Sequence, residues 1–294
     1  MNISVIGAGQ MGNGIAHVFA QNGHSVVLID LSRENLETAL AVIGRNMDRQ
    51  VAKEKMTAEE KGSALSRIST STELAEGVRH ADLVVEAATE LVDLKLRIFK
   101  DLDAAAPDQC ILATNTSSIS ITRIAAATGR PEQVIGMHFM NPVPVMRLVE
   151  VIRGYDTSDA VTAQIVDLSK AIGKVPVTVN DYAGFVANRI LMPMINEAVQ
   201  TLWQGVGGVE EIDTIMKLGM AHPMGPLQLA DFIGLDTCLA IMKVLHEGLG
   251  EAKYAPCPLL VQMVTAGKLG VKSGEGFYTY TAGSKDLVVA PAFR

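Results

Sequence analysis

The segment from His138 to Glu150 carries a histidine and a glutamate on either side of a proline-containing turn. If the apolar runs 134–139 and 148–152 form an antiparallel hairpin centred on Pro144, His138 and Glu150 lie directly opposite each other. Opposed side chains have Cβ atoms roughly 4.5–5.5 Å apart, within reach of an imidazole–carboxylate hydrogen bond. The carboxylate would fix the imidazole tautomer and stabilise its protonated form, as a general base requires. The spacing alone is equally consistent with a strand-capping histidine and a solvated glutamate.

A glycine-rich motif near the start of the chain predicts a dinucleotide site. It follows the apolar run 2–6, precedes a helical pattern over 12–22, and is followed by a second apolar run, 25–29. The first glycine permits a tight turn, the second lets the backbone approach a pyrophosphate, and the third lets helix and strand pack closely. The helix N-terminus would offer N–H groups to the phosphates. The motif consists of Gly7, Ala8, Gly9, Gln10, Met11 and Gly12.

Asp30 ends the second apolar run and indicates which dinucleotide is bound. Its carboxylate would accept hydrogen bonds from both ribose hydroxyls of NAD and repel the 2′-phosphate of NADP. No arginine follows until Arg33. These residues favour NAD as the bound dinucleotide. FAD is the main alternative cofactor, and a glycine turn that binds no ligand is the other alternative.

Polar side chains also follow three other apolar runs that are typical of buried strands. Residues 86–90 follow the run 83–85, residues 115–118 follow 111–114, and His138 and Asn141 lie at the end of 134–139. Ligands of open parallel sheets bind at the carboxyl ends of the strands. We therefore expect a nicotinamide and a substrate to lie across these ends.

The elements that position these residues form two domains. Strand–helix–strand spacing over residues 2–29 implies parallel strands and a right-handed crossover, so residues 1–181 are expected to form an α/β, Rossmann-like domain with a mostly parallel sheet. Residues 33–67 read as two helices broken near Thr57, where Thr57 and Glu60 form a capping-box pattern. Helical periodicity over 190–203, 209–218, 226–248 and 258–266 makes residues 182–294 an all-α domain, with the last dozen residues as a loose tail.

Composition narrows the class of protein. A net charge of −7 over 294 residues argues against nucleic acid as the main partner. No signal peptide and no apolar stretch of about 20 residues is present, so we expect a cytoplasmic protein without a membrane partner. Cys110, Cys238 and Cys257 lack motif spacing, and the six histidines lack ligand-type spacing, which predicts free thiols and no metal site.

Taken together, the motifs resemble those of the L-3-hydroxyacyl-CoA dehydrogenase family, including bacterial 3-hydroxybutyryl-CoA dehydrogenases. The similarity covers nearly the whole chain, and several separate motifs in one order are far more specific than the glycine loop. They are the segment 138–150 with Val5-Ile6-Gly7-Ala8-Gly9-Gln10-Met11-Gly12, Asp82-Leu83-Val84-Val85-Glu86-Ala87, Asn115-Thr116-Ser117-Ser118, Gly184-Phe185-Val186-Ala187-Asn188-Arg189, His222-Pro223-Met224-Gly225-Pro226 and Gly274-Glu275-Gly276-Phe277-Tyr278.

The resemblance implies an NAD-dependent, reversible oxidation of L-3-hydroxyacyl-CoA to 3-ketoacyl-CoA. His138 would be the general base for the 3-hydroxyl, and Glu150 would orient and support it. Ser117 would hydrogen-bond the reacting oxygen, and Asn188 would help hold the substrate carbonyl end. Further positions match residues that contact the cofactor: Glu90, Lys95, Ser117, Asn141 and, from the second domain, Lys272.

The substrate and the second domain give further expectations. Arg45, Arg49 and Lys53 are spaced by four, so on one helix they share a face that could meet CoA phosphates. The acidic neighbours Asp48 and Glu54 fit a solvated face equally well. The resemblance implies a homodimer through the C-terminal domain and a place in short-chain fatty acid or butanoate metabolism.

Three other classes remain open from the sequence. The β-hydroxyacid dehydrogenases share the glycine loop, but their lysine-base motif is absent here. Gulonate dehydrogenases of the crystallin type share the fold, yet the Asn141-Pro142-Val143-Pro144 context fits the CoA enzymes better. A non-enzymatic NAD-binding protein is disfavoured because none of the expected catalytic positions is replaced.

Overall fold

The computed structural model describes residues 1–281, 283–284 and 286–294. The chain divides into two compact units, Met1–Tyr182 and Ala183–Arg294. The domain boundary expected between residues 181 and 182 lies one residue from this division. Each unit is described by itself.

The first unit is built on an eight-stranded sheet, ordered β3-β2-β1-β4-β5-β6-β7-β8. Strands β1 to β6 are parallel, β7 runs antiparallel to β6, and β8 runs parallel to β7. This confirms the predicted Rossmann-like, mostly parallel sheet. The two edge strands, β3 and β8, were not predicted from the sequence. The strands are β1 (Asn2–Ile6), β2 (Ser25–Ile29), β3 (Ile68–Ser71), β4 (Leu83–Glu86), β5 (Ile111–Thr114), β6 (Val134–Phe139), β7 (Leu148–Arg153) and β8 (Val175–Asn180).

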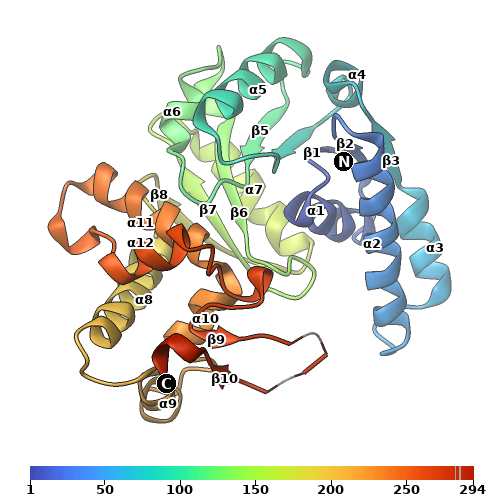
Figure 1. Cartoon of the computed structure of the whole chain (residues 1–294). Helices are drawn as coiled ribbons and strands as arrows, with labels where there is room; N and C mark the ends of the chain where they lie inside the picture. The colour runs from blue at the N-terminus through green and yellow to red at the C-terminus, as the bar shows by residue number, and fades with distance from the viewer. Residues whose placement is uncertain (282, 285) are drawn as a thin grey trace. The chain divides into compact units, whose positions relative to one another are not determined.

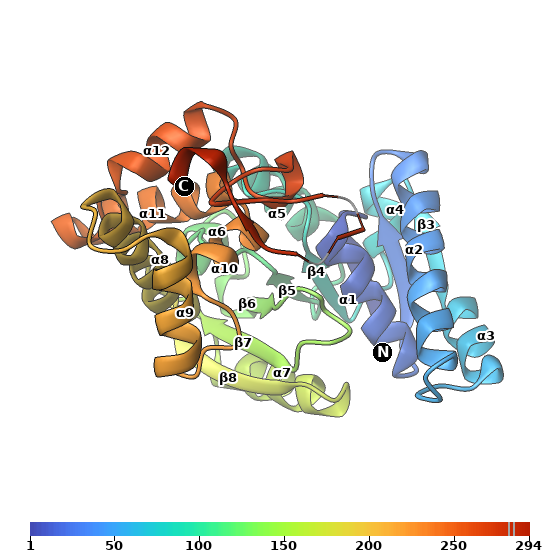
Figure 2. The same ribbon diagram turned by 60° about the horizontal axis from the view of Figure 1, so that its bottom comes forward.

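Helices cover both faces of this sheet (Figure 1). On one face, α1 (Gln10–Gln21), α2 (Arg33–Val51), α3 (Ala58–Ser66) and α7 (Asp159–Ala171) share a single apolar core with alternate strand residues. On the other face lie α4 (Leu74–Val78), α5 (Val92–Ala105) and α6 (Ile121–Ala125), with a short 3-10 turn at Pro131–Gln133 before β6. Figure 2 shows α7 beside β7 and β8, with α1 and α2 beyond it near the N-terminus.

The break between α2 and α3 follows from capping chemistry. Thr57 accepts a hydrogen bond from the Glu60 backbone N–H at 3.1 Å, and Glu60 accepts one from the Thr57 N–H at 2.7 Å. This reciprocal pair is the capping box expected from the sequence, and it starts α3. Helix α2 ends at Val51, so Lys53 lies in the connecting turn instead of on the helix. The expectation of one helical face bearing Arg45, Arg49 and Lys53 is therefore wrong for Lys53.

The second unit is mainly helical, as predicted. Among the described residues, its apolar core joins all five helices with buried residues of the Cys257 and Phe277 segments. The helix expected over 226–248 is two helices, because Gly234 has φ +100° and interrupts the chain between them. The elements are α8 (Ala187–Trp203), α9 (Val209–Gly219), α10 (Pro226–Ile233), α11 (Leu235–Leu249), α12 (Pro258–Thr265), the strands β9 (Tyr278–Thr279) and β10 (Val288–Val289), and 3-10 turns at Ala252–Tyr254, Val271–Ser273 and Pro291–Phe293.

The end of the chain is folded and not the loose tail expected from its sequence. Strand β10 pairs antiparallel with β9, and Ala290 is completely buried. The Phe293 ring lies 5.8 Å from the Phe277 ring, measured between centroids. This two-stranded ribbon was missed because two-residue strands leave no periodicity to detect.

Membrane-spanning helices, metal sites and cysteines were the subject of further expectations. Within the described residues, no helix is long and apolar enough to cross a membrane, and no cluster of His, Cys, Asp or Glu could hold a metal ion. Cys110, Cys238 and Cys257 are free and buried, which confirms the prediction of free thiols. Burial raises the pKa of the Cys110 and Cys238 thiols to about 12, so neither is a reactive thiolate at neutral pH.

Candidate active site

His138 and Glu150 are direct cross-strand partners in the β6–β7 hairpin. The distance between His138 Nδ1 and Glu150 Oε2 is 2.8 Å, and the two residues are only 7% and 3% exposed. This confirms the register predicted from the symmetry about Pro144. A carboxylate only accepts hydrogen bonds, so in the neutral imidazole Nδ1 carries the proton and Nε2 carries the lone pair. The pair is therefore arranged as an oriented imidazole base.

The two side chains project on the α6 side of the sheet. A Cβ added to Gly136 would lie 2.9 Å from Ile121 of α6, so even-numbered residues of β6 face that helix. Phe139, the next residue in the strand, faces the opposite side, where its ring lies 6.3 Å from Phe19 of α1. Strand alternation thus gives His138 to the site and Phe139 to the core.

The loop after β5 is tied to the histidine strand and shaped by its own hydroxyls. Asn115 Oδ1 accepts a hydrogen bond from the Phe139 backbone N–H at 2.9 Å. Thr116 Oγ1 accepts bonds from the N–H groups of Ser118 at 3.3 Å and Ile119 at 3.0 Å. Ser117, predicted to bind the reacting oxygen, lies in this turn, which the Thr116 hydroxyl stabilises.

Glu86, one of the polar residues expected at the strand ends, is a buried carboxylate, and its burial was not predicted from the sequence. Glu86 is completely buried at the end of β4 and forms an ion pair with Lys95, which is 1% exposed. Its Oε2 also accepts from Thr114 Oγ1 at 2.8 Å. Lys95 was expected to contact the cofactor, and the structure shows its ammonium engaged inside the protein. The available signal was an acidic residue ending a fully apolar strand.

Glu90 connects this ion pair to the Ser117 turn. Its Oε2 lies 3.6 Å from Lys95 Nζ, and its Oε1 accepts from the Ser117 backbone N–H at 2.6 Å. Thr116 Oγ1 donates to the same carboxylate at 2.9 Å. The Glu90 side chain is 46% exposed, so Glu90 offers an accessible carboxylate next to Ser117.

The glycine loop fits the backbone requirements of a dinucleotide site. Gly7 has φ +95°, and an added Cβ would lie 2.7 Å from the backbone of Ala87. A Cβ on Gly12 would lie 1.7 Å from the Gly7 carbonyl oxygen. A Cβ on Gly9 would meet nothing within 4 Å, so the space beside this residue is open to a ligand. Gly7 and Gly12 therefore have the turn and packing roles expected from the motif, and the open space at Gly9 is compatible with the approach of a pyrophosphate.

The start of α1 and Asp30 complete this region. No side chain caps α1, and its first turn contains no acidic residue, so its N-terminal positive end suits a pyrophosphate. Asp30 accepts from Ala8 N–H at 2.9 Å, Ser32 N–H at 3.0 Å and Asn35 Nδ2 at 3.1 Å. A carboxylate has about four acceptor positions, which leaves capacity for a ribose hydroxyl. These residues fit NAD.

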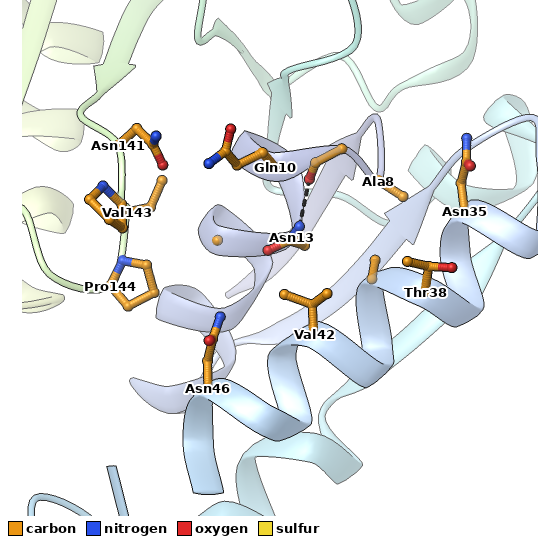
Figure 3. Close-up of a pocket in the computed structure, with 14 residues that line it drawn as sticks. Ala8, Gln10, Asn13, Asn35, Thr38, Val42, Asn46, Asn141, Val143 and Pro144 are labelled. Atoms are coloured by element: carbon orange, nitrogen blue, oxygen red, sulfur yellow. Dashed lines mark hydrogen bonds between the residues drawn. The ribbon is translucent and has the colours of Figure 1, made fainter. Parts of the chain in front are cut away.

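A cavity of about 490 Å³ lies beside the glycine loop. One wall is the β6–β7 loop, where Asn141, Val143 and Pro144 face Gln10 and Asn13 of α1 (Figure 3). A second wall is a stripe of α2, and Figure 3 shows its side chains pointing toward the cavity. The stripe consists of Asn35, Thr38, Ala39, Val42 and Asn46.

The cationic residues proposed for CoA lie past one end of this stripe. Arg49 follows Asn46 by one turn of α2, and its Nη1 lies 3.4 Å from Asn46 Oδ1. Lys53 is exposed in the turn beyond the helix. Asp48, which the sequence left as a neutralising neighbour, forms an ion pair with Lys61 instead. The structure thus places Arg49, but not Lys53, in line with the cavity wall.

Two predicted site residues belong to the second unit. Asn188 is buried in the first turn of α8. Lys272 lies in the 3-10 turn Val271–Ser273, with Nζ 2.5 Å from Asp236 Oδ1. Their approach to the first unit stays a prediction.

Asp231 anchors the segment that follows Lys272. It is 1% exposed and accepts from the Phe277 N–H at 3.0 Å, the Tyr278 N–H at 2.9 Å and the Tyr280 hydroxyl at 3.0 Å. Burial raises the pKa of its carboxyl to about 6 despite these donors. Asp231 therefore has a structural role, because it holds the backbone of the segment 277–278 in place.

Comparisons with known proteins agree with the motifs. The chain matches the family models of the 3-hydroxyacyl-CoA dehydrogenase NAD binding domain over residues 2–182 and of the C-terminal domain over residues 184–280. It is 56% identical over 278 residues to a 3-hydroxybutyryl-CoA dehydrogenase of Bradyrhizobium diazoefficiens, covering 95% of this chain and 94% of the relative. It is 45% identical over 286 residues to the human mitochondrial hydroxyacyl-coenzyme A dehydrogenase, covering 95% and 91%.

A similar solved structure is that of (S)-3-hydroxybutyryl-CoA dehydrogenase from Ralstonia eutropha. Its TM-score is 0.92 at 51% identity, and the match covers 95% of this chain and 99% of that one. The fold, the NAD-type glycine loop and the two family models all agree. The chain is therefore an NAD-dependent enzyme that belongs to the 3-hydroxyacyl-CoA dehydrogenase family.

Proposed function

We propose that the protein interconverts L-3-hydroxyacyl-CoA and 3-ketoacyl-CoA, with His138 as the general base and Glu150 as its support. The 2.8 Å contact between His138 Nδ1 and Glu150 Oε2 carries this proposal. NAD would accept the hydride that leaves C3, the carbon that bears the hydroxyl. The protein supplies a base for the hydroxyl proton and a carboxylate for the resulting imidazolium.

The proton moves through His138 Nε2. In the oxidation, Nε2 takes the proton of the 3-hydroxyl, and the Glu150 carboxylate stabilises the positive ring that results. In the reduction, the same nitrogen returns the proton to the keto oxygen. Ser117 donates a hydrogen bond to that oxygen, and Asn188 helps hold the thioester carbonyl.

Several residues bind and orient NAD in this proposal. The Gly9 backbone and the α1 N-terminus receive the pyrophosphate, and Asp30 receives the adenosine ribose. Glu90, next to Ser117, serves the nicotinamide end, and Lys95 acts on the cofactor mainly through Glu90. The remaining cofactor contacts proposed are Gly7, Ala8, Gln10, Met11, Gly12, Asn141 and, from the second unit, Lys272.

The substrate class follows from the relatives and the cavity. The Bradyrhizobium and Ralstonia relatives are named 3-hydroxybutyryl-CoA dehydrogenases, so we propose a short-chain acyl-CoA and a place in short-chain fatty acid or butanoate metabolism. The amide-rich cavity beside Asn141 suits the uncharged arm of CoA. Arg49 and Lys53 are proposed for its phosphates. The cytoplasmic location stays a prediction, to be tested by cell fractionation.

A homodimer through the C-terminal unit is also proposed. The second half of α9 and the residue after it expose large apolar side chains: Ile215 is 61% exposed, Leu218 82% and Met220 60%. Burying them against a second copy would remove apolar surface from water. Light scattering of the purified protein should give twice the mass of the chain, and Leu218→Glu should shift it toward the monomer. A monomeric wild type at micromolar concentration contradicts the dimer.

The proposed activity is tested by following NADH consumption with acetoacetyl-CoA. We expect turnover with this thioester and NADH, and much weaker turnover with NADPH. Free acetoacetate and a free sugar acid serve as control substrates, because they distinguish a CoA enzyme from a hydroxy-acid dehydrogenase. Turnover with the free acids but not with the thioester would overturn the proposal.

A further inference from the structure

Lys174 is a buried lysine that grips the loop between the two catalytic strands. It lies at the turn between α7 and β8 and is 8% exposed. Its Nζ donates hydrogen bonds to the carbonyl oxygens of Val143 and of Met146, the latter at 2.8 Å. Both acceptors belong to the β6–β7 loop, which is more than 25 residues earlier in the chain.

The opposite side of the same loop is seated on α1. Val143 is 2% exposed, and a Cβ added to Gly14 would lie 2.9 Å from the Val143 Cβ. The loop is also closed on itself, because Pro142 O accepts from the N–H groups of Val145 and Met146, both at 2.9 Å. The position of the loop therefore depends on the space that Gly14 leaves in α1 at one side and on Lys174 at the other.

This loop connects the site to the cavity. It follows the strand of His138 and precedes the strand of Glu150. Asn141 and Pro144 project from it into the 490 Å³ cavity beside the glycine loop (Figure 3). A displacement of about 1 Å in such a wall is enough to misplace a bound substrate.

Lys174 makes no ion pair among the described residues, which is unusual for a buried ammonium. Its pKa is lowered, and burial is the cause. The neighbouring titratable group is His17 of α1, whose own pKa is lowered by burial and by the charge of Lys174. His17 Nε2 lies 3.0 Å from Gln21 Oε1 and 3.3 Å from Gln50 Nε2, which are uncharged. The ammonium is thus directed at backbone carbonyls and not at a counter-ion.

We infer that Lys174 is a positioning residue that holds the β6–β7 loop in the shape needed for substrate binding. Two charge-assisted bonds from one ammonium fix both ends of the segment 143–146 against the sheet. The chemical step does not involve Lys174, and its contribution is to the geometry of Asn141 and Pro144. The link to acyl-CoA binding rests on the proposed function, whereas the grip on the loop does not.

The test compares Lys174→Met with Lys174→Arg in the full-length protein. Methionine keeps the volume but removes both bonds, so the KM for acetoacetyl-CoA should rise about tenfold while kcat stays within about threefold. Hydrogen exchange of residues 140–147 should accelerate in Lys174→Met. Arginine keeps a charged donor, so Lys174→Arg should recover most of the wild-type KM and exchange protection. Lys170→Met is the control, since Lys170 lies in the last turn of α7, is exposed and pairs only with Asp167 among the described residues.

A second measurement decides the case if Lys174→Met does not fold. Because burial lowers the pKa of Lys174, its charge is lost at a lower pH than that of a free lysine. Loop exchange in the wild type, corrected for the intrinsic pH dependence, should accelerate as the pH rises through this pKa, and Lys174→Arg should not show this. His17 is already neutral there and adds no competing titration.

Two results would overturn the inference. One is a Lys174→Met variant with the wild-type KM and the wild-type loop exchange rate. The other is a loop exchange rate with the same pH dependence in the wild type and in Lys174→Arg. An inactive wild type with acetoacetyl-CoA would instead refute the proposed function. The exchange data would still test the grip in that case.

Discussion

Replacing Glu150 with glutamine removes a charge from the site with little change of shape. The introduced amide oxygen could still accept the hydrogen bond from His138 Nδ1, which is 2.8 Å from Glu150 Oε2 in the wild type. The neutral amide could not stabilise the positive ring that forms when His138 takes the substrate proton. The variant therefore isolates the electrostatic contribution of the pair.

The size of the effect follows from burial. His138 is 7% exposed and Glu150 3%, so solvent screens their interaction poorly. A hydrogen bond to a charged group contributes about 1.5–3 kcal/mol net, and two unit charges about 4 Å apart near a protein surface interact by about 4 kcal/mol. At about 1.4 kcal/mol per tenfold, kcat of Glu150→Gln should fall roughly 10-fold to 10³-fold.

The assay measures kcat with L-3-hydroxybutyryl-CoA and NAD, and the Kd of NADH by fluorescence. We expect the loss in kcat with an unchanged Kd, because Asp30 and the glycine loop are untouched. Glu132→Gln is the matched control, as Glu132 is exposed just before β6 and should leave both quantities unchanged. A kcat within about twofold of wild type would refute the reasoning, and a collapsed NADH affinity would assign Glu150 a structural role.

Three further variants test other parts of the molecule. Asp30→Ala should weaken NAD binding roughly 10-fold to 100-fold and reduce the preference over NADP; an unchanged ratio of the two Kd values contradicts the assignment. Gly12→Ala should lower stability by more than about 2 kcal/mol, because its Cβ would lie 1.7 Å from the Gly7 carbonyl oxygen, whereas Gly62→Ala, which meets nothing within 4 Å, should not destabilise the protein in urea. Burial lowers the pKa of His17 below 6.5, so the stability it contributes is present above that pH and is lost as the pH falls below it. Wild type should therefore lose more stability than His17→Gln between about pH 7.5 and 5.5 in thermal melts, and equal losses would contradict this.

Features set by local pattern could be predicted from the sequence. The antiparallel register about Pro144 follows from hairpin symmetry, and it correctly paired His138 with Glu150. The capping box at Thr57 and the roles of the glycines follow from backbone chemistry within a few residues. Each depends on neighbours in sequence or on a single hairpin.

Features that depend on how separate elements pack against one another could not be predicted in the same way. The buried ion pair of Glu86 and Lys95 depends on how α5 folds back onto β4, and the grip of Lys174 depends on a contact with Val143 across 31 positions. Hydrophobic periodicity carries no information about such pairs. The tail was misjudged for a related reason, since Phe293 is ordered by contact with Phe277 and not by its own sequence pattern.

The central claim is that His138 is the general base, and one variant tests it most directly. His138→Gln should lower kcat for L-3-hydroxybutyryl-CoA oxidation by about 10²-fold to 10⁴-fold, while the Kd of NADH stays at the wild-type value. A kcat within about threefold of wild type, or a loss of NADH binding in a folded variant, would contradict the account.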